Sequence, residues 1–274
     1  MVQTIACANQ KGGVGKTTTV VNLASQLATS GHRLLVVDLD PQGNATSGFG
    51  VDRSLLDQSI YDGVVDGAPL EELIVTTSAA GVDLVPSAIA LAGAEVELAI
   101  VDARERRLRR LIEGVLDRYD VILIDCPPSL GLLTVNALTA ADAVLIPLQC
   151  EYYALEGLTQ LLATIDLVRD HLNPRLAVDG VVLTMADGRT NLSSDVAAEA
   201  RRHLGSLVYD TVIPRNVRLS EAPSHGLPID RYAPDSRGAK AYAELAREFD
   251  QRHAWSSTAP ETVSFHVREA VVVA

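Results

Sequence analysis

The stretch that most constrains this chain is residues 9–19, NQKGGVGKTTT, which lies between an apolar run at 2–8 and an amphipathic run at 20–28. This order predicts a strand, a loop and a helix. Glycines at 12, 13 and 15 let backbone N–H groups turn inward, and a helix that begins near Lys16 directs its positive dipole end to the same place. The stretch therefore predicts a phosphate-binding loop.

Two lysines characterise this loop. Lys16 is expected to neutralise the β- and γ-phosphates of a nucleotide, and the Thr17 hydroxyl to ligate Mg²⁺. Gln10 stands where the usual G-x-x-x-x-G-K-[ST] pattern has its first glycine, and Lys11 is an additional lysine beside it. A glycine-rich loop could instead be an ordinary tight turn, and Lys11 a solvated charge. The agreement of glycines, lysine, threonines and flanking elements favours the phosphate loop.

Acidic residues follow two further apolar runs. Residues 33–38 indicate a buried parallel strand, and Asp40 lies in the loop just after it, well placed to handle Mg²⁺ or water. Asp40 could instead cap the next helix. A second strand ends in Asp125, the position of a Walker B acid that holds Mg²⁺. The segment 127–131, PPSLG, is stiff and then flexible, which suits a loop that senses the γ-phosphate.

The rest of the chain alternates strands and helices, which predicts an α/β fold: a doubly wound, mostly parallel sheet with helices on both faces. A length of 274 residues, 47% of them hydrophobic, and the lack of a Pro/Gly/Ser-rich linker indicate one domain, 1–252, with a loosely attached tail at 253–274. Further strands are expected at 82–86, 143–148, 176–185 and 207–213, and helices at 91–119, 154–171, 191–205 and 236–252. Residues 52–81 are expected to form short helices and turns, and 214–223 to be too polar for a core.

The net charge of −12 argues against a nucleic-acid partner, but the charge is unevenly distributed. Between residues 38 and 97 eleven acids face a single arginine, whereas 201–240 carry seven bases and four acids and could form a basic face. Cysteines 7, 126 and 150 lack metal-ligand spacing, there is no signal-peptide pattern, and no apolar run approaches the roughly 20 residues of a membrane helix. We therefore expect a cytoplasmic protein with reduced cysteines.

Four motifs together resemble the ParA/Soj chromosome- and plasmid-partitioning ATPases, over about residues 3–250. They are KGGVGKTT at 11–18, DPQGNAT at 40–46, IDCPP at 124–128 and IPRNVRLSEAPSHG at 213–226. The loop alone would indicate only the wider ParA/MinD/nitrogenase-iron-protein superfamily of P-loop NTPases with a deviant Walker A sequence. The second and fourth motifs indicate the chromosomal ParA branch.

The resemblance implies roles for individual residues. ATP closes two subunits of this family into a sandwich dimer, so Lys11 is expected to reach the partner's phosphates; a cation supplied in trans makes the active state depend on dimerisation. Asp40 would orient the hydrolytic water, and Asp125 would hold Mg²⁺ through water. The residues implied in catalysis are Lys11, Lys16 and Asp40; in Mg²⁺ binding, Thr17, Asp40 and Asp125; in ATP binding, Lys11, Gly12, Gly13, Val14, Gly15, Lys16, Thr17, Thr18, Pro214 and Asn216.

Sequence-independent binding of double-stranded DNA is assigned by the same resemblance to Arg189 and Arg218. An arginine in a loop with no clear acid partner, as Arg189 is expected to be, is a reasonable phosphate contact. A homodimer doubles such a patch, which reconciles an acidic chain with a polyanionic partner.

The resemblance implies a nucleotide switch: ATP-bound dimers associate with the nucleoid, and a ParB-like centromere-binding protein stimulates hydrolysis and release. Two alternatives stay open. One is a MinD-like membrane-associated ATPase, although Arg268 is the only Lys or Arg after residue 252. The other is an ATP-dependent metabolic enzyme on the same fold.

Overall fold

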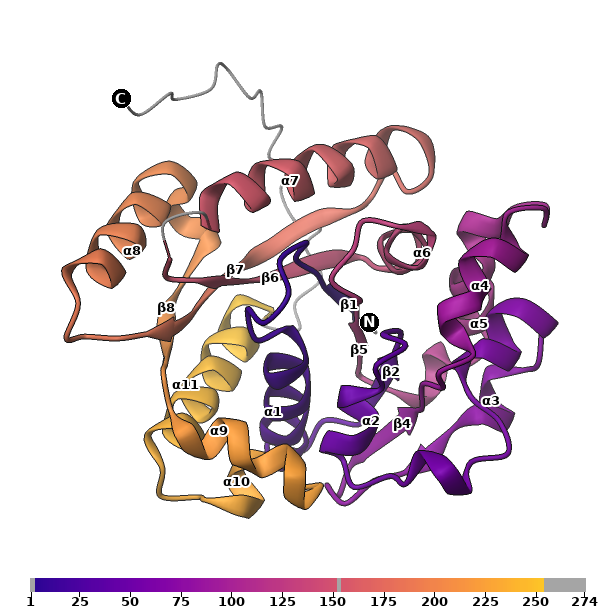
Figure 1. Cartoon of the computed structure of the whole chain (residues 1–274), viewed down its shortest axis with the longest axis horizontal. Coiled ribbons are helices and arrows are strands. Elements are labelled where there is room, and N and C mark those ends of the chain that lie inside the picture. The colour runs from indigo at the N-terminus through magenta and orange to yellow at the C-terminus, as the bar shows by residue number, and fades with distance from the viewer. Residues whose placement is uncertain (1–2, 152–153, 254–274) are drawn as a thin grey trace.

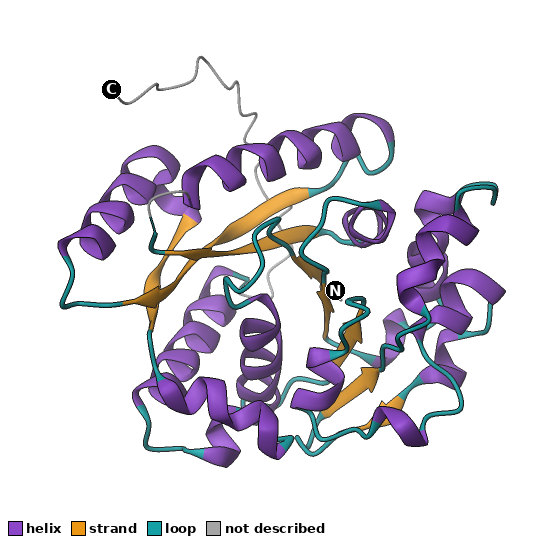
Figure 2. Cartoon of the chain, in the orientation of Figure 1, coloured by secondary structure: helices purple, strands orange, loops and turns teal. Residues whose placement is uncertain are grey.

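A computed structural model describes residues 3–151 and 154–253. Its central sheet has eight strands in the order β3-β4-β2-β5-β1-β6-β7-β8, and only the β3–β4 pair is antiparallel. The strands are β1 (Gln3–Cys7), β2 (Leu34–Asp38), β3 (Val75–Thr76), β4 (Val82–Val85), β5 (Val121–Asp125), β6 (Ala143–Gln149), β7 (Ala177–Ala186) and β8 (Val208–Pro214). The predicted mostly parallel sheet is confirmed, and all its parallel strands end at one edge (Figures 1 and 2).

Helices cover both faces of the sheet, because its strands carry apolar side chains on both faces. In β2, Leu35 and Val37 belong to one buried cluster, and Leu34 and Val36 to the other. The first cluster packs under α3 (Leu70–Leu73), α4 (Leu91–Leu98), α5 (Arg107–Glu113), α6 (Leu132–Ala140), α7 (Ala154–His171) and α8 (Asn191–Leu204). The second packs under α1 (Lys16–Thr29), α2 (Asn44–Gly48), α9 (Val217–Glu221), α10 (Ile229–Tyr232) and α11 (Arg237–Arg252) (Figure 1).

The predicted helix at 91–119 is wrong as a single element. It divides into α4 and α5, because Ala103 adopts φ 51°, in the left-handed region, and the Arg104 guanidinium donates to the carbonyl of Ala99. Residues 52–81 contain a π-helical turn (Asp62–Asp66) and also the short edge strand β3. The polar segment after β8 forms the short helix α9.

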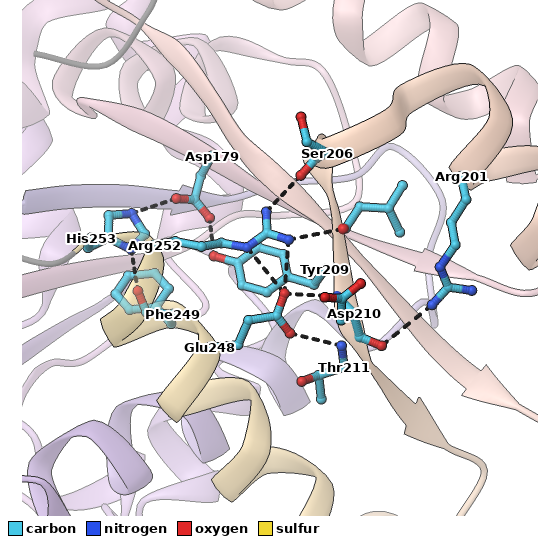
Figure 3. Close-up of polar contacts among 11 residues, drawn as sticks. Asp179, Arg201, Ser206, Tyr209, Asp210, Thr211, Glu248, Phe249, Arg252 and His253 are labelled. Carbon is cyan, nitrogen blue, oxygen red and sulfur yellow. Dashed lines mark hydrogen bonds and ion pairs between the residues drawn. The ribbon is translucent and has the colours of Figure 1, made fainter.

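Helix α11 closes the sheet along its edge strand β8 (Figure 3). The Glu248 carboxylate accepts the N–H groups of Asp210 and Thr211, each at 2.8 Å, and the Arg252 guanidinium lies over the Tyr209 ring and donates to the carbonyls of residues 206 and 208 (Figure 3). Backbone groups that an edge strand would otherwise leave unpaired are thereby satisfied.

The end of α11 is anchored by a buried ion pair. His253 Nε2 lies 2.6 Å from Asp179 Oδ1 on β7, and the Tyr209 hydroxyl donates to the other oxygen of Asp179 (Figure 3). His253 is the first residue of the predicted tail; the remainder, 254–274, lies outside the described residues. Within 3–151 and 154–253, none of the helices combines the length and apolar character needed to cross a bilayer.

Candidate nucleotide-binding site

The loop between β1 and α1 has the backbone that its glycines predict. Gly13 and Gly15 adopt φ values of 75° and 92°, in the left-handed region that glycine alone enters readily. Gly12 and Gly13 are exposed, whereas Val14 is buried. Gly15 is the N-cap of α1 and offers no side chain to its N–H groups, so the start of a fourteen-residue helix is open to an anion.

Two side chains hold this loop against the neighbouring strands. Thr184 Oγ1 on β7 donates to the carbonyl of Val14 at 2.8 Å, and the Asn9 amide donates to the carbonyl of Pro147 on β6 at 2.7 Å. Asn9 Oδ1 in turn accepts the N–H of Lys11 at 3.0 Å, which shapes the first turn of the loop. The loop is therefore positioned by β6 and β7 as well as by its own glycines.

The two lysines of the loop have different surroundings. Lys16 is 6% exposed, and its Nζ donates to the carbonyl of Lys11 at 3.2 Å, so its ammonium lies back over the loop. The Lys11 side chain is 39% exposed and forms an ion pair with Glu151, just after β6, with 2.9 Å between Nζ and Oε2. The alternative of a purely solvated charge at Lys11 is wrong for this subunit, because an acid in the same chain holds it.

Asp38 and Asp125 end adjacent strands as register partners, and both are fully buried. Asp38 accepts the N–H and the hydroxyl of Thr46, at 2.7 and 2.6 Å. Neither carboxylate oxygen of Asp125 has a hydrogen-bond partner within the described part of the chain. Burial, followed by the charge of Asp38, raises the pKa of Asp125 well above its ordinary value, whereas the nearby Thr17 and Lys16 side chains act in the opposite direction.

The unpartnered Asp125 carboxylate fits a divalent cation. A buried carboxylate without a partner is costly, and a cation or its bound water would satisfy it. Thr17, in the first turn of α1, adds a hydroxyl oxygen nearby, and oxygen ligands are those that Mg²⁺ prefers. Among the described residues there is no group of three or more His, Cys, Asp or Glu arranged to hold a metal. Mg²⁺ bound together with a nucleotide typically takes one or two protein oxygens, with water and phosphate as its other ligands.

Asp40 lies in the loop after β2 and is 7% exposed. Its Oδ1 accepts the N–H of Gln42 at 2.9 Å, and its own N–H donates to Asp38 Oδ1 at 3.3 Å, which keeps it close to the buried acids. The N-cap of α2 is Gly43, so the alternative that Asp40 caps the next helix is wrong. The structure thus brings Asp40 and Asp125 together with the glycine loop and the first turn of α1, where Thr17 and Thr18 stand.

Pro214 and Asn216 lie farther along the same edge of the sheet. Pro214 ends β8 opposite Ala186, with β6 and β7 between its strand and β1. Asn216 is the N-cap of α9, and its side-chain oxygen accepts the N–H of Arg218 at 2.9 Å. Asn216 therefore caps α9, and this role does not depend on a contact with adenine.

The two arginines assigned to DNA by resemblance are exposed, but each is paired with an acid. Arg189, in the turn after β7, makes a two-pronged ion pair with Asp187, at 2.9 and 2.7 Å. Arg218 Nη1 lies 2.8 Å from Glu221 Oε2, one helical turn away. The expectation that Arg189 has no acid partner is wrong, because the turn at 187–190 folds its side chain back onto the acid two residues earlier.

Three residues that shape the site were not predicted from the sequence: Asp38, Glu151 and Thr184. Asp38 ends β2 and Glu151 follows β6, and both strands end at the same edge as β5, so an acid at the end of each apolar run is the pattern that could have found them. Thr184 directly follows the apolar residues 181–183 of β7 and is β-branched like the valines, so the sequence gives no sign of a separate role for it. Among the described residues, the cysteines at 7, 126 and 150 are free and buried.

Comparison with known proteins shows the family of the chain. Residues 2–178 match the sequence profile of a family described as AAA domain. The sporulation initiation inhibitor protein Soj of Bacillus subtilis is 58% identical over 248 residues, which cover 90% of this chain and 98% of that protein. The chromosome partitioning protein ParA of Caulobacter vibrioides is 52% identical over 253 residues, covering 92% of this chain and 95% of that protein.

The chain belongs to the ParA/Soj family of chromosome-partitioning ATPases. Among solved structures, a cobyrinic acid a,c-diamide synthase from Mycobacterium smegmatis with bound ATP analogue and magnesium matches with a TM-score of 0.82. It is 38% identical, and the match covers 96% of this chain and all of that one. The chain of this partitioning ATPase thus combines a mostly parallel sheet with a glycine loop and a buried acid at the end of β5.

Proposed function

We propose that residues 1–252 of this ParA/Soj ATPase act as one domain that binds ATP and Mg²⁺, closes into a sandwich dimer, binds double-stranded DNA without sequence preference, and is released by hydrolysis that a ParB-like partner stimulates. The observation that carries the proposal is the pairing of an open glycine loop with a second, half-exposed lysine, Lys11, at its mouth. The protein would then act in the cytoplasm on the nucleoid.

Within one subunit, the roles follow from the surroundings of each group. The N–H groups of residues 12–18 and the Lys16 ammonium would hold the phosphates, with Thr17 and Asp125 as oxygen ligands of Mg²⁺. When bound, Mg²⁺ neutralises charge on the β- and γ-phosphates. Asp40, fixed by Gln42 beside the buried acids, would accept a hydrogen bond from water and orient it toward the γ-phosphate.

Across two subunits, Lys11 would leave Glu151 and reach the phosphates bound by the other subunit. A half-exposed lysine on a flexible stem can make this exchange at low cost, because exposed ion pairs are weak. The charge shifted during phosphoryl transfer would then be stabilised only in the dimer. Pro214 and Asn216 would contact the adenine from the same edge of the sheet.

DNA binding would use Arg189 and Arg218, which must exchange Asp187 and Glu221 for phosphate oxygens. Both pairs are on the surface, where water and salt weaken them, so a polyanion can compete. Exposed bases between residues 201 and 240, such as Arg215, add positive charge to this end of the chain. Dimerisation would double these contacts and make DNA binding depend on ATP.

A gel-shift series with ATP and with ADP tests the proposal, using wild type, Lys16→Ala, Asp40→Ala and Arg218→Ala. Asp40→Ala should accumulate the DNA-bound state, whereas Lys16→Ala loses the ATP-bound dimer and Arg218→Ala loses a phosphate contact. Arg110→Ala, an exposed arginine on α5, is the matched control and should bind DNA like wild type. Equal DNA binding with ATP, ADP and no nucleotide would refute the switch.

A second candidate comes from the name of the Mycobacterium smegmatis structure, which is that of a diamide synthase. The higher identity to proteins named for chromosome partitioning, 52–53%, favours the switch. The two differ in what accelerates ATP hydrolysis. Stimulation by cobyrinic acid, with none by DNA and a ParB-like protein, would favour the synthase.

A further inference from the structure

The outer side of α4 and its flanks is apolar and exposed. Ile89, Val96 and Ile100 are 81, 77 and 92% exposed, and steps of seven and then four residues place them on one side of a helical segment. Smaller exposed residues fill the space between them. We call this surface the α4 face; its residues are Ile89, Ala92, Gly93, Val96, Ala99 and Ile100. An apolar surface of this kind on a folded domain marks a contact site.

The α4 face is bordered by acids. From Ser54 to Ala103 the sequence contains nine acidic residues and no Lys, Arg or His. The Tyr61 hydroxyl donates to Glu97 Oε2 at 2.8 Å, and this bond together with the charges of Glu97, Asp66 and Asp62 raises the pKa of Tyr61. Two of the nearby bases donate to backbone carbonyls, Arg104 to that of Ala99 and Arg107 to those of Val64 and Val65, whereas Arg106 is exposed.

The inner side of α4 is connected to the segment that follows the Walker B acid. Glu95 Oε1 accepts the N–H of Leu133, in the first turn of α6, at 3.3 Å. The same carboxylate lies so close to Gly131 that a Cβ there would overlap it. Gly131 is the last residue of the 127–131 segment, which begins two residues after Asp125. A displacement of α4 would therefore move the segment next to the Mg²⁺ site.

We infer that the α4 face is the docking site for a basic, amphipathic segment of the partner that stimulates ATP hydrolysis, and that Glu95 transmits its binding to the 127–131 segment. The inference rests on the proposed function. The position of the α4 face agrees with a docking role, since α3, α4 and α5 lie together at one side of the molecule, away from α8 and α9 (Figure 1). A partner can therefore occupy this face while Arg189 and Arg218 hold DNA.

The acidic border selects this occupant over the other surfaces that could cover an apolar face. In a symmetric contact between two copies, the acidic border of one copy would meet the acidic border of the other, and this repulsion costs free energy. An anionic lipid surface or a nucleic acid meets the same repulsion. Lysine and arginine side chains flanking apolar residues would satisfy both the apolar centre and the acidic border.

The test replaces Ile89, Val96 and Ile100 together by serine, which the exposure of these side chains allows without loss of the core. Leu167→Ser, also at an exposed leucine, 61% exposed on α7, is the matched control. The probe is the ParB-like protein of the same organism, bound to its DNA site. We expect the triple variant to need at least tenfold more partner for half-maximal stimulation, with unchanged basal hydrolysis and ATP-dependent DNA binding. Raising salt should weaken wild-type stimulation.

Glu95 has its own test, which separates binding from transmission. Glu95→Ala should bind the partner with wild-type affinity but show at least tenfold less stimulated turnover, and Glu95→Gln, which keeps an acceptor for Leu133, should restore it.

The outcomes are distinguishable. Wild-type stimulation in the triple variant refutes the docking site. Loss of ATP-dependent dimer and DNA binding in that variant would make the α4 face a subunit interface, and loss of binding to anionic vesicles would make it a membrane contact; either overturns the inference. A wild-type protein that binds DNA without regard to nucleotide refutes the proposed function itself.

Discussion

Replacing Glu151 with glutamine tests whether the subunit restrains its own Lys11. In the single subunit the Lys11 ammonium is held by this carboxylate, whereas the proposed dimer needs the same ammonium at the partner's phosphates. The substitution removes the charge and keeps an oxygen that can accept the bond from Gln149. If the ion pair restrains Lys11, its removal should favour the dimer.

The exposure of the pair sets the size of the effect. The two side chains are 39% and 45% exposed. An ion pair of this exposure stabilises by about 0.2–1 kcal/mol, so two subunits together give up roughly 0.4–2 kcal/mol on dimerisation. Since about 1.4 kcal/mol corresponds to a factor of ten, Glu151→Gln should lower the dimer dissociation constant by roughly two- to thirtyfold.

Sedimentation equilibrium with a non-hydrolysable ATP analogue measures this constant. The control is a double-mutant cycle with Lys11→Gln, in which the effect of Glu151→Gln should disappear. A dimer that is weaker than wild type, or a strengthening that persists without Lys11, would refute the reasoning.

Three further predictions concern the glycine loop, the buried acid and the anchor of α11. Gly15→Ala forces a side chain into φ 92°, which costs about 1–3 kcal/mol of stability, and it should abolish ATP binding measured by calorimetry. The control Gly12→Ala, at a glycine without positive φ, should fold normally. Equal stability of the two variants in urea would contradict this prediction. Burial and a neighbouring carboxylate raise the pKa of Asp125 in the folded state. As pH rises from the ordinary aspartate pKa of about 4 through this raised value, ionisation of Asp125 therefore lowers the stability of the fold. Asp125→Asn should therefore gain stability over wild type in urea at pH 7.5 and less at pH 4, while losing Mg²⁺-dependent nucleotide binding. Burial lowers the pKa of His253, but the hydrogen bond to Asp179 outweighs this effect and the net pKa is raised. The contribution of the pair to folding stability is therefore present at low pH and is lost as pH rises through the pKa of the folded state. His253→Gln should cost more stability at pH 6 than at pH 8.5, and an equal cost at both would show that the pair is not charged.

The glycine loop, Asp40 and Asp125 could be predicted because each lies at a strand end whose apolar residues are contiguous in the sequence. The chain order of strand, loop and helix then fixes the edge at which they meet. The alternation of Leu35 and Val37 with Leu34 and Val36 likewise indicates a strand buried on both faces.

Contacts between distant segments could not be read in this way. Glu151 lies 140 residues from Lys11, and Thr184 lies 170 residues from Val14, so only the sheet order brings them together. The break between α4 and α5 depends on a single left-handed residue, Ala103, whose side chain gives no indication of that conformation.

The end of β7 joins two parts of the molecule that the sequence keeps far apart. Thr184 holds the phosphate loop through Val14, Met185 stands at φ 52° where a side chain is strained, and Arg189 follows in the next turn. Six residues of chain, 184–189, thus connect the phosphate loop to the turn that we propose binds DNA. A shift of Val14 on phosphate binding would act directly on Thr184, so the turn at 187–190 lies only a few residues from any movement of the loop.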